Sequence, residues 1–125
     1  MSENKEYIVT REEKGRIHIS EEVIASIAAA AAMEVDGVSG LSSTLGPDGA
    51  HRLSPKNMKR GVRISQSGDS LRLDVGIFVA YGHTIPQVAE KVQAAVRASV
   101  ENSTGRHVGN VHIYVGGVTL EKPKA

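Results

Sequence analysis

The sequence predicts an α/β (α+β) fold, a two-layer sandwich in which two helices lie on one face of a mixed β-sheet. Two observations lead to this prediction. Segments with an apolar residue at every second position alternate with two segments whose apolar residues recur every three or four positions, which are the periods of strands and helices. Each clear strand is apolar on one side, and two amphipathic helices can cover only one face of a sheet. The expected element order is β-α-β-β-β-α-β, in which the second strand is the least defined.

The first predicted strand runs from Gly15 to Ile19, where apolar and polar residues alternate. Ser20 then supplies an N-cap oxygen for a helix that we expect to continue to about Asp36. Gly37 can adopt the left-handed conformation that ends many helices, and a short strand is expected over Val38 to Ser42. The first strand is expected to turn two side chains toward the core, Ile17 and Ile19.

Two further strands, a second helix and a last strand complete the predicted fold. The strands join at the turn Ser67-Gly68-Asp69, and Leu71 to Val79 becomes apolar on both sides near its end, which indicates a central place in the sheet. Thr84 and Gln87 have the spacing of a capping box at the start of the second helix, and Gly105 is its expected stop. The inward residues of the last strand are expected to be Val111, Ile113 and Val115.

The organisation expected along the chain is one domain between two short terminal segments. A chain of 125 residues supports one hydrophobic core, which we place over residues 15–118. Residues 1–14 are charged around a small apolar patch and are interpreted as a flexible N-terminal arm, and residues 119–125 as a C-terminal tail. Gly46 to Met58 is a long connection rich in turn residues, of a kind that is either functional or simply mobile.

No segment of this sequence is predicted to enter a membrane. The first residues lack the apolar region of a signal peptide. The longest nearly apolar run, Val23 to Met33, is shorter than the roughly 20 residues that a bilayer-spanning helix needs. The absence of cysteine is compatible with a reducing compartment. These features predict a cytoplasmic protein without direct membrane insertion.

The composition disfavours several classes of function. Lys and Arg number 15 against 14 Asp and Glu, which gives a formal charge of +1 and no general excess for neutralising phosphates. One Phe, three Tyr and no Trp argue against an aromatic platform for bases or sugars. The absence of Cys excludes disulfides, thiolate nucleophiles and cysteine metal sites.

The chain offers no recognisable catalytic, metal or cofactor pattern. The five histidines are scattered, and His107 and His112 fall on opposite faces of one strand, which does not suit joint metal ligation. The glycine pairs near Gly37 and Gly116 do not lie between a strand and the start of a helix, as a phosphate loop requires. We therefore expect no catalytic residue, no metal and no cofactor, and a protein that is not an enzyme.

Two groups of residues remain as candidates for contact with a partner. The first is a segment without acidic residues, whose basic members are Arg52, Lys56, Lys59, Arg60 and Arg63. Such a segment suits a phosphate, an anionic lipid surface or an acidic protein, and it is also typical of a solvated loop. The second is the sheet face that the helices leave uncovered, on which we expect Arg16, His18, Arg63, Arg72, Asp74, Phe78, His112 and Tyr114. Its mixture of aromatic and basic side chains is typical of protein interfaces, with an ordinary solvated face as the alternative.

The favoured function is a non-enzymatic scaffold or adaptor that acts through self-association or by docking on a partner protein. The alternative is an RNA-binding or other nucleic-acid-binding module that uses the basic segment and the uncovered sheet face, because four-stranded sheets with aromatic and basic residues can bind RNA. The aromatic residues are few and Asp74 interrupts the positive charge, so nucleic acid is not the favoured partner.

Several ordered segments resemble one known family. Tyr81 to Gln93, with the sequence YGHTIPQVAEKVQ, resembles the signature stretch of the alkaline shock proteins, which are also described as envelope stress response proteins. Leu73 to Val79 and Lys59 to Ile64 are similar to the strands that precede this stretch. Further similar segments are Gly15 to Ser20, Val35 to Leu41 and Gly105 to Val118. The resemblance covers about residues 15–118 and departs mainly from Gly46 to Met58.

The resemblance implies a small, abundant cytoplasmic protein of mostly Gram-positive bacteria, linked to cell-envelope stress or to envelope and lipid homeostasis. Some relatives are held near the membrane by a separate anchor protein. Others are housekeeping paralogues, often encoded beside a fatty-acid kinase of the dihydroxyacetone-kinase type. The partners implied are therefore a membrane-anchored adaptor, a fatty-acid-kinase-type protein or further copies of the chain. The family has no established catalytic residues, so none is transferred.

Overall fold

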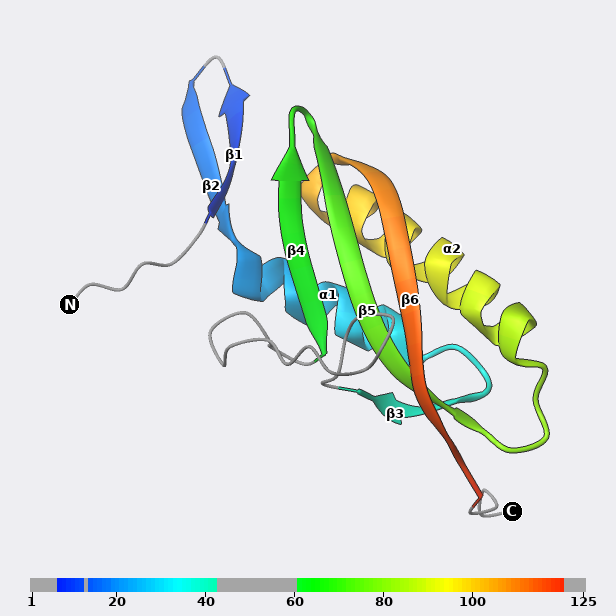
Figure 1. Ribbon diagram of the computed structural model, residues 1–125. Coiled ribbons are helices and arrows are strands. Elements are labelled where there is room, and N and C mark those ends of the chain that lie inside the picture. Colours follow the sequence, from blue (N-terminus) through cyan, green and yellow to red (C-terminus); the bar gives the residue numbers. More distant parts are fainter. Residues whose placement is uncertain (1–6, 13, 43–60, 121–125) are drawn as a thin grey trace.

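The computed structural model describes residues 7–12, 14–42 and 61–120 (Figure 1). The element order is β-β-α-β-β-β-α-β. The elements are β1 (Tyr7–Glu12), β2 (Gly15–Ser20), α1 (Glu21–Met33), β3 (Val38–Leu41), β4 (Val62–Ser67), β5 (Ser70–Ala80), α2 (Ile85–Thr104) and β6 (His107–Thr119). The predicted fold class is confirmed, and one strand precedes those that the sequence predicted.

Strand β5 is the centre of a four-stranded mixed sheet, as its two-sided apolar pattern predicted. The parallel strand β6 pairs with β5 from Ser70 to Ala80. The opposite side of β5 is shared by two antiparallel strands, β4 along its first half and β3 along its second half. They meet at Gly76, whose N–H donates to the Gly61 carbonyl at 3.0 Å and whose carbonyl accepts from the Ser42 N–H at 2.8 Å. Ser42 and Gly61 are the described residues on either side of the long connection, and both are hydrogen-bonded to Gly76.

Both helices lie on the same face of this sheet, which makes a two-layer sandwich (Figure 1). The alternate residues of β5 that face the helices are all buried, because both helices pack on this face of the sheet. These residues are Leu71, Leu73, Val75, Ile77 and Val79. Helix α1 packs on them mainly through alanines and Ile24, and α2 through a row of valines at positions 88, 92, 96 and 100. Within the described residues, no helix covers the sheet face that carries Asp74.

Helix α1 starts as predicted and ends earlier. The Ser20 hydroxyl accepts a hydrogen bond from the Val23 N–H at 3.2 Å, so the predicted N-cap is confirmed. The helix ends at Met33 and not near Asp36, because the chain turns at once toward β3. Gly37 lies in that turn with φ of 103°, and a β-carbon there would come within 2.8 Å of Val88 on α2. Glycine at this position therefore allows the turn to approach α2 closely.

Helix α2 has the predicted stop but not the predicted capping box. Thr84 is the N-cap residue, but its side chain makes no capping bond, and its carbonyl accepts the ordinary first helical bond from the Val88 N–H. Pro86 lies in the first turn, where its missing N–H costs nothing. Gly105 is left-handed with φ of 74°, and its N–H donates to the Glu101 carbonyl at 2.9 Å. Gly105 therefore predicted the end of this helix correctly, whereas the spacing of Thr84 and Gln87 did not produce a capping box.

The N-terminal region differs most from the prediction. Residues 7–12, interpreted from the sequence as part of a flexible arm, form β1 and pair antiparallel with β2 as a two-stranded sheet. Ile8 is buried in the hydrophobic core, and the Arg106 side chain donates to the Val9 carbonyl at 3.0 Å. Strand β2 is therefore not part of the main sheet. Ile17, expected to face the core, is 50% exposed.

Candidate protein-contact surface

The candidate surface is the face of the four-stranded sheet that the helices do not cover. Residues that pair across neighbouring strands share a face, so the register Arg63 to Asp74 to His112 places these side chains together. The same register places Tyr114 beside Gly76. This face, called here the open face, carries six of the residues that the sequence predicted for it: Arg63, Arg72, Asp74, Phe78, His112 and Tyr114.

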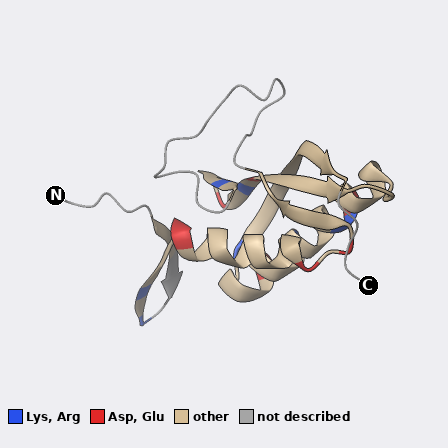
Figure 2. Ribbon diagram, turned by 90° about the horizontal axis from the view of Figure 1, so that it is seen from below, with Lys and Arg blue, Asp and Glu red and all other residues tan. Residues whose placement is uncertain are grey.

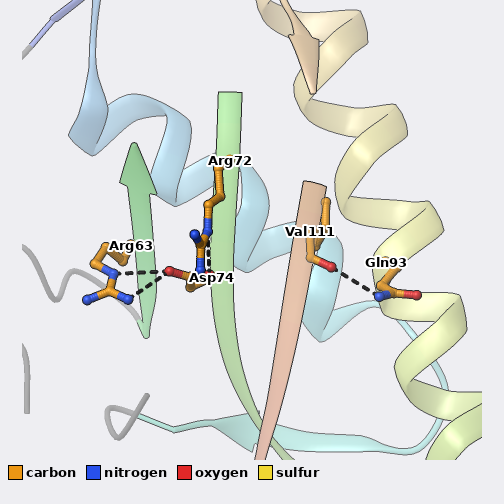
Figure 3. A network of polar contacts seen from close by, with 5 residues as sticks. All are labelled: Arg63, Arg72, Asp74, Gln93 and Val111. Carbon is orange, nitrogen blue, oxygen red and sulfur yellow. Dashed lines mark hydrogen bonds and ion pairs between the residues drawn. The ribbon is translucent and has the colours of Figure 1, made fainter. Parts of the chain in front are cut away.

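The centre of the open face is a carboxylate held between two arginines (Figure 3). Arg63 on β4 donates from Nε and Nη2 to Oδ2 of Asp74, at 3.1 and 2.9 Å. Arg72, two residues before Asp74 on β5, donates from Nε to Oδ1 at 3.3 Å. The Asp74 side chain is 2% exposed, whereas those of Arg63 and Arg72 are 39% and 46% exposed. The arginines thus cover the carboxylate and remain accessible themselves.

This arrangement has a clear chemical consequence. Both oxygens of Asp74 already accept hydrogen bonds from guanidinium groups, so the carboxylate is committed to an ion pair and is poorly placed to take a proton from a substrate. Two arginines against one carboxylate leave one positive charge on the cluster. Asp74 also fixes the orientation of both guanidinium planes, and oriented arginine forks recognise carboxylates by paired hydrogen bonds.

Phe78 extends the open face beyond the charged cluster. It is half-buried, and its ring lies over glycines on both neighbouring strands. A β-carbon at Gly117 would be 3.3 Å from the ring, and one at Gly40 would be 3.7 Å from it. The glycines therefore provide room for an aromatic ring against the strands.

Two of the predicted contact residues, Arg16 and His18, are not on the open face, and four others lie outside the described residues. Arg16 and His18 belong to β2, which pairs only with β1 in the described chain, so placing them on the main sheet was wrong. His18 instead packs edge-on against Tyr7, with ring centroids 5.9 Å apart. The basic residues Arg52, Lys56, Lys59 and Arg60 lie outside the described residues.

A row of polar side chains on α2 was missed by the sequence analysis. Gln93 donates to the Val111 carbonyl at 3.0 Å (Figure 3), Arg97 donates to the Val108 carbonyl, and Glu101 accepts from the Val108 N–H at 2.8 Å. These residues recur every four positions, which places them on one side of the helix. That spacing could have predicted a polar row on one side of the helix, but it is equally typical of an ordinary solvated helix face. The row satisfies the backbone of β6 on the side away from β5.

The described residues supply no other evident centre of chemistry. Nowhere in residues 7–12, 14–42 and 61–120 do three or more His, Asp or Glu side chains gather as metal ligands would. Among the described residues, the basic side chains belong to the hairpin, the main sheet and α2, and in Figure 2 the blue segments are scattered and do not form one stripe. Neither helix of the described chain is long and apolar enough to cross a membrane. The fold and surface together define a small α+β domain whose most structured polar feature is an arginine–aspartate cluster on an uncovered sheet.

Comparison with known proteins identifies the family. Residues 9–120 match the model of the alkaline shock protein family, which is described as having a cell envelope-related function, and the chain belongs to this family. It is 39% identical to YloU of Bacillus subtilis (strain 168), over 93% of this chain and 98% of that protein. It is 32% identical to YqhY of the same organism, over 86% of this chain and 79% of that protein. A solved structure titled as the copper form of MamM CTD aligns with a TM-score of 0.49 at 20% identity, covering 82% of this chain and 91% of that one. The resemblance inferred from Tyr81 to Gln93 is thereby confirmed.

Proposed function

We propose that this chain is a non-enzymatic adaptor of the cell envelope, which docks through its open face on an acidic segment of a partner protein. The family's cell envelope-related function supports the setting. The observation that carries the proposal is the cluster of Arg63, Asp74 and Arg72, where a buried carboxylate orients two half-exposed guanidinium groups. The adaptor works in the cytoplasm and comes near the membrane through its partner, either a membrane-anchored protein or a fatty-acid-kinase-type protein.

The chemistry of the cluster favours a carboxylate-bearing protein partner. The contacts with Asp74 use Nε and Nη2 of Arg63 and Nε of Arg72. No other hydrogen bond of these two guanidinium groups is found within the described residues, so the rest of each fork is available to an incoming oxygen. Half-buried Phe78, His112 and Tyr114 on the same face supply apolar and polar contact area beside the charge. Arginine and tyrosine are enriched in protein interfaces.

The test removes the charges without leaving one of them unpaired. The triple variant Arg63→Met, Arg72→Met, Asp74→Leu replaces the cluster by apolar side chains, and such replacements of buried ion pairs are commonly neutral or stabilising. Lys91→Met is the matched control, because Lys91 is exposed on α2, in the layer opposite the open face. A photo-crosslinking amino acid at position 65, an exposed position that pairs with Arg72 on the side of β5 away from β6, would report contacts of the open face in the cell of origin.

We expect one crosslinked protein with the wild type and with Lys91→Met, and its loss with the triple variant, whose fold is checked by thermal unfolding. An identical crosslink in a folded triple variant would overturn the proposal. A crosslinked product that disappears on nuclease treatment would instead support the nucleic-acid alternative.

A further inference from the structure

Strand β6 has one protected and one unprotected stretch along its outer edge, meaning the side that does not face β5. From Val108 to Val111 the outer edge is bonded to Gln93, Arg97 and Glu101. Beyond Val111, no strand or side chain of the described residues pairs with that edge. An unpaired strand edge is a template for another strand, and proteins usually block it with charges or cover.

The unprotected stretch also lacks charge and exposes apolar side chains. No Asp, Glu, Lys or Arg occurs from His107 to Leu120. Val115, Val118 and Leu120 are 37%, 43% and 74% exposed. Tyr81, which is 72% exposed, lies beside them, because its N–H donates to the Thr119 carbonyl at 2.8 Å. An apolar patch therefore continues from the open edge of β6.

A second copy of the same strand fits this edge in one antiparallel register. The register of β6 shifts between Ile77 and Phe78, which makes Gly116 an extra residue. Val115 pairs with Ile77 and Val118 with Val79, so both valines face the helix layer although they are three residues apart. Paired residues of an antiparallel sheet share a face, and Val115 of one copy opposite Val118 of the other meets that condition.

The direction of the backbone groups agrees with the same register. The carbonyl of Val111 points away from β5, and that of Thr119 points toward the Tyr81 N–H on the β5 side. Backbone groups alternate in direction along a strand, and the extra residue Gly116 shifts that alternation by one position. The N–H and C=O groups of Val115 and Val118 therefore both point outward. The register also places Ile113 opposite Leu120 and Tyr114 opposite Thr119, with the two-fold axis between Gly116 and Gly117. No Asp, Glu, Lys or Arg lies among the described residues that this register pairs, Ile113 to Leu120, so like charges do not meet along it.

We propose that β6 pairs antiparallel with β6 of a second copy of this chain, across a two-fold axis at Gly116 and Gly117, so that the two main sheets become continuous. The same patch meets itself, so the contact closes at two copies. The row of Gln93, Arg97 and Glu101 limits the pairing to the stretch after Val111. This self-pairing uses a different surface from the cluster of Arg63, Asp74 and Arg72 and does not depend on the proposed docking function.

A charge test of the full chain measures its molecular mass by light scattering and sedimentation over a range of concentrations. We expect a dimer for the wild type and a monomer for Val115→Lys with Val118→Lys, because four lysines would meet at the axis. Both positions are already exposed, so the fold should persist. Ile17→Lys is the control, since Ile17 is 50% exposed on the hairpin, and it should stay dimeric. A monomeric wild type, or a dimer that survives both lysines, would overturn the proposal.

A cysteine test reads the register itself, because the chain contains no cysteine. Residues paired through hydrogen bonds in an antiparallel sheet have Cα atoms about 5.5 Å apart, within the span of a disulfide. We expect a mixture of Val115→Cys and Val118→Cys proteins to form a crosslinked heterodimer under mild oxidation, and either protein alone to crosslink much less. Equal crosslinking of each protein alone would contradict this register.

Discussion

Ile8 on β1 lies directly opposite Ile19 on β2, and Ile8 is 1% exposed although it belongs to a hairpin outside the main sheet. The hairpin therefore packs against the domain through this face. A two-stranded hairpin is at best marginally stable in water by itself. The burial of Ile8, together with the bond from Arg106 to the Val9 carbonyl, is what holds this one in place.

Shortening Ile8 should therefore weaken the attachment of the hairpin. Ile8→Ala is expected to cost about 2–4 kcal/mol, as for other buried isoleucines replaced by alanine. Ile17→Ala in the same hairpin, at a half-exposed position, should cost within about 0.5 kcal/mol. Urea unfolding measures both, and limited proteolysis shows whether the loss is confined to the hairpin. Equal costs for the two variants would mean that Ile8 does not anchor the hairpin.

The sequence could not reveal this strand for a physical reason. The apolar residues Tyr7, Ile8 and Val9 form a short run among charged residues, and local pattern alone does not distinguish such a run from a frayed terminus. Its strand partner β2 is close in the chain, but the bond from Arg106 to Val9 that ties the hairpin to the domain spans 97 residues. The turns were predictable where glycine needs positive φ, as at Gly105, because that requirement is local.

The stability of the protein should respond unequally to loss of the cluster's one negative charge and loss of its two positive charges. Asp74→Asn leaves Arg63 and Arg72 free to turn to solvent, and should cost about 1–2 kcal/mol. Arg63→Met with Arg72→Met leaves a carboxylate that is 2% exposed without a cation, and should cost about 3–5 kcal/mol. Adding Asp74→Leu to the double variant should restore most of that stability. Denaturant unfolding measures the free energy of unfolding of each variant. A larger loss of stability from Asp74→Asn than from the double variant would contradict the view that the two arginines compensate a buried carboxylate.

Part of this cluster was visible in the sequence. Alternation along a strand places Arg72 and Asp74 on one face, and the hairpin turn at Ser67-Gly68-Asp69 brings Arg63 alongside. The burial of Asp74 was not visible, because it depends on how both guanidinium groups fold over it. The misplacement of Arg16 and His18 has a related cause, since alternation gives the faces of a strand but not the sheet to which it belongs.

Close approach of β6 to the end of β3 makes Gly116 sensitive to substitution. A β-carbon at Gly116 would be 2.5 Å from the Ser42 hydroxyl oxygen, so Gly116→Ala should cost about 1–3 kcal/mol by overpacking. Gly40→Ala is the control, because its nearest neighbour would be the Phe78 ring at an ordinary 3.7 Å. In a double-mutant cycle, Ser42→Gly should reduce the cost of Gly116→Ala by roughly 1 kcal/mol. Strict additivity of the two substitutions would show that the approach is relieved elsewhere.

The bond between Glu101 and the Val108 N–H predicts how the protected stretch of β6 opens. Oε2 of Glu101 accepts this bond at 2.8 Å and lies 3.3 Å from Nδ1 of His107. Glu101→Ala removes a charged acceptor, which is worth about 1.5 kcal/mol at the low end for such bonds, or roughly tenfold in an opening equilibrium. The Val108 amide should therefore exchange its hydrogen about tenfold faster. Glu90→Ala, at an exposed position on the same helix, should leave that exchange unchanged.

Glu101→Ala also lengthens the unprotected edge of β6, so this variant should associate into species larger than a dimer at high concentration. Unchanged exchange of the Val108 amide together with an unchanged molecular mass would show that α2 does not protect the edge.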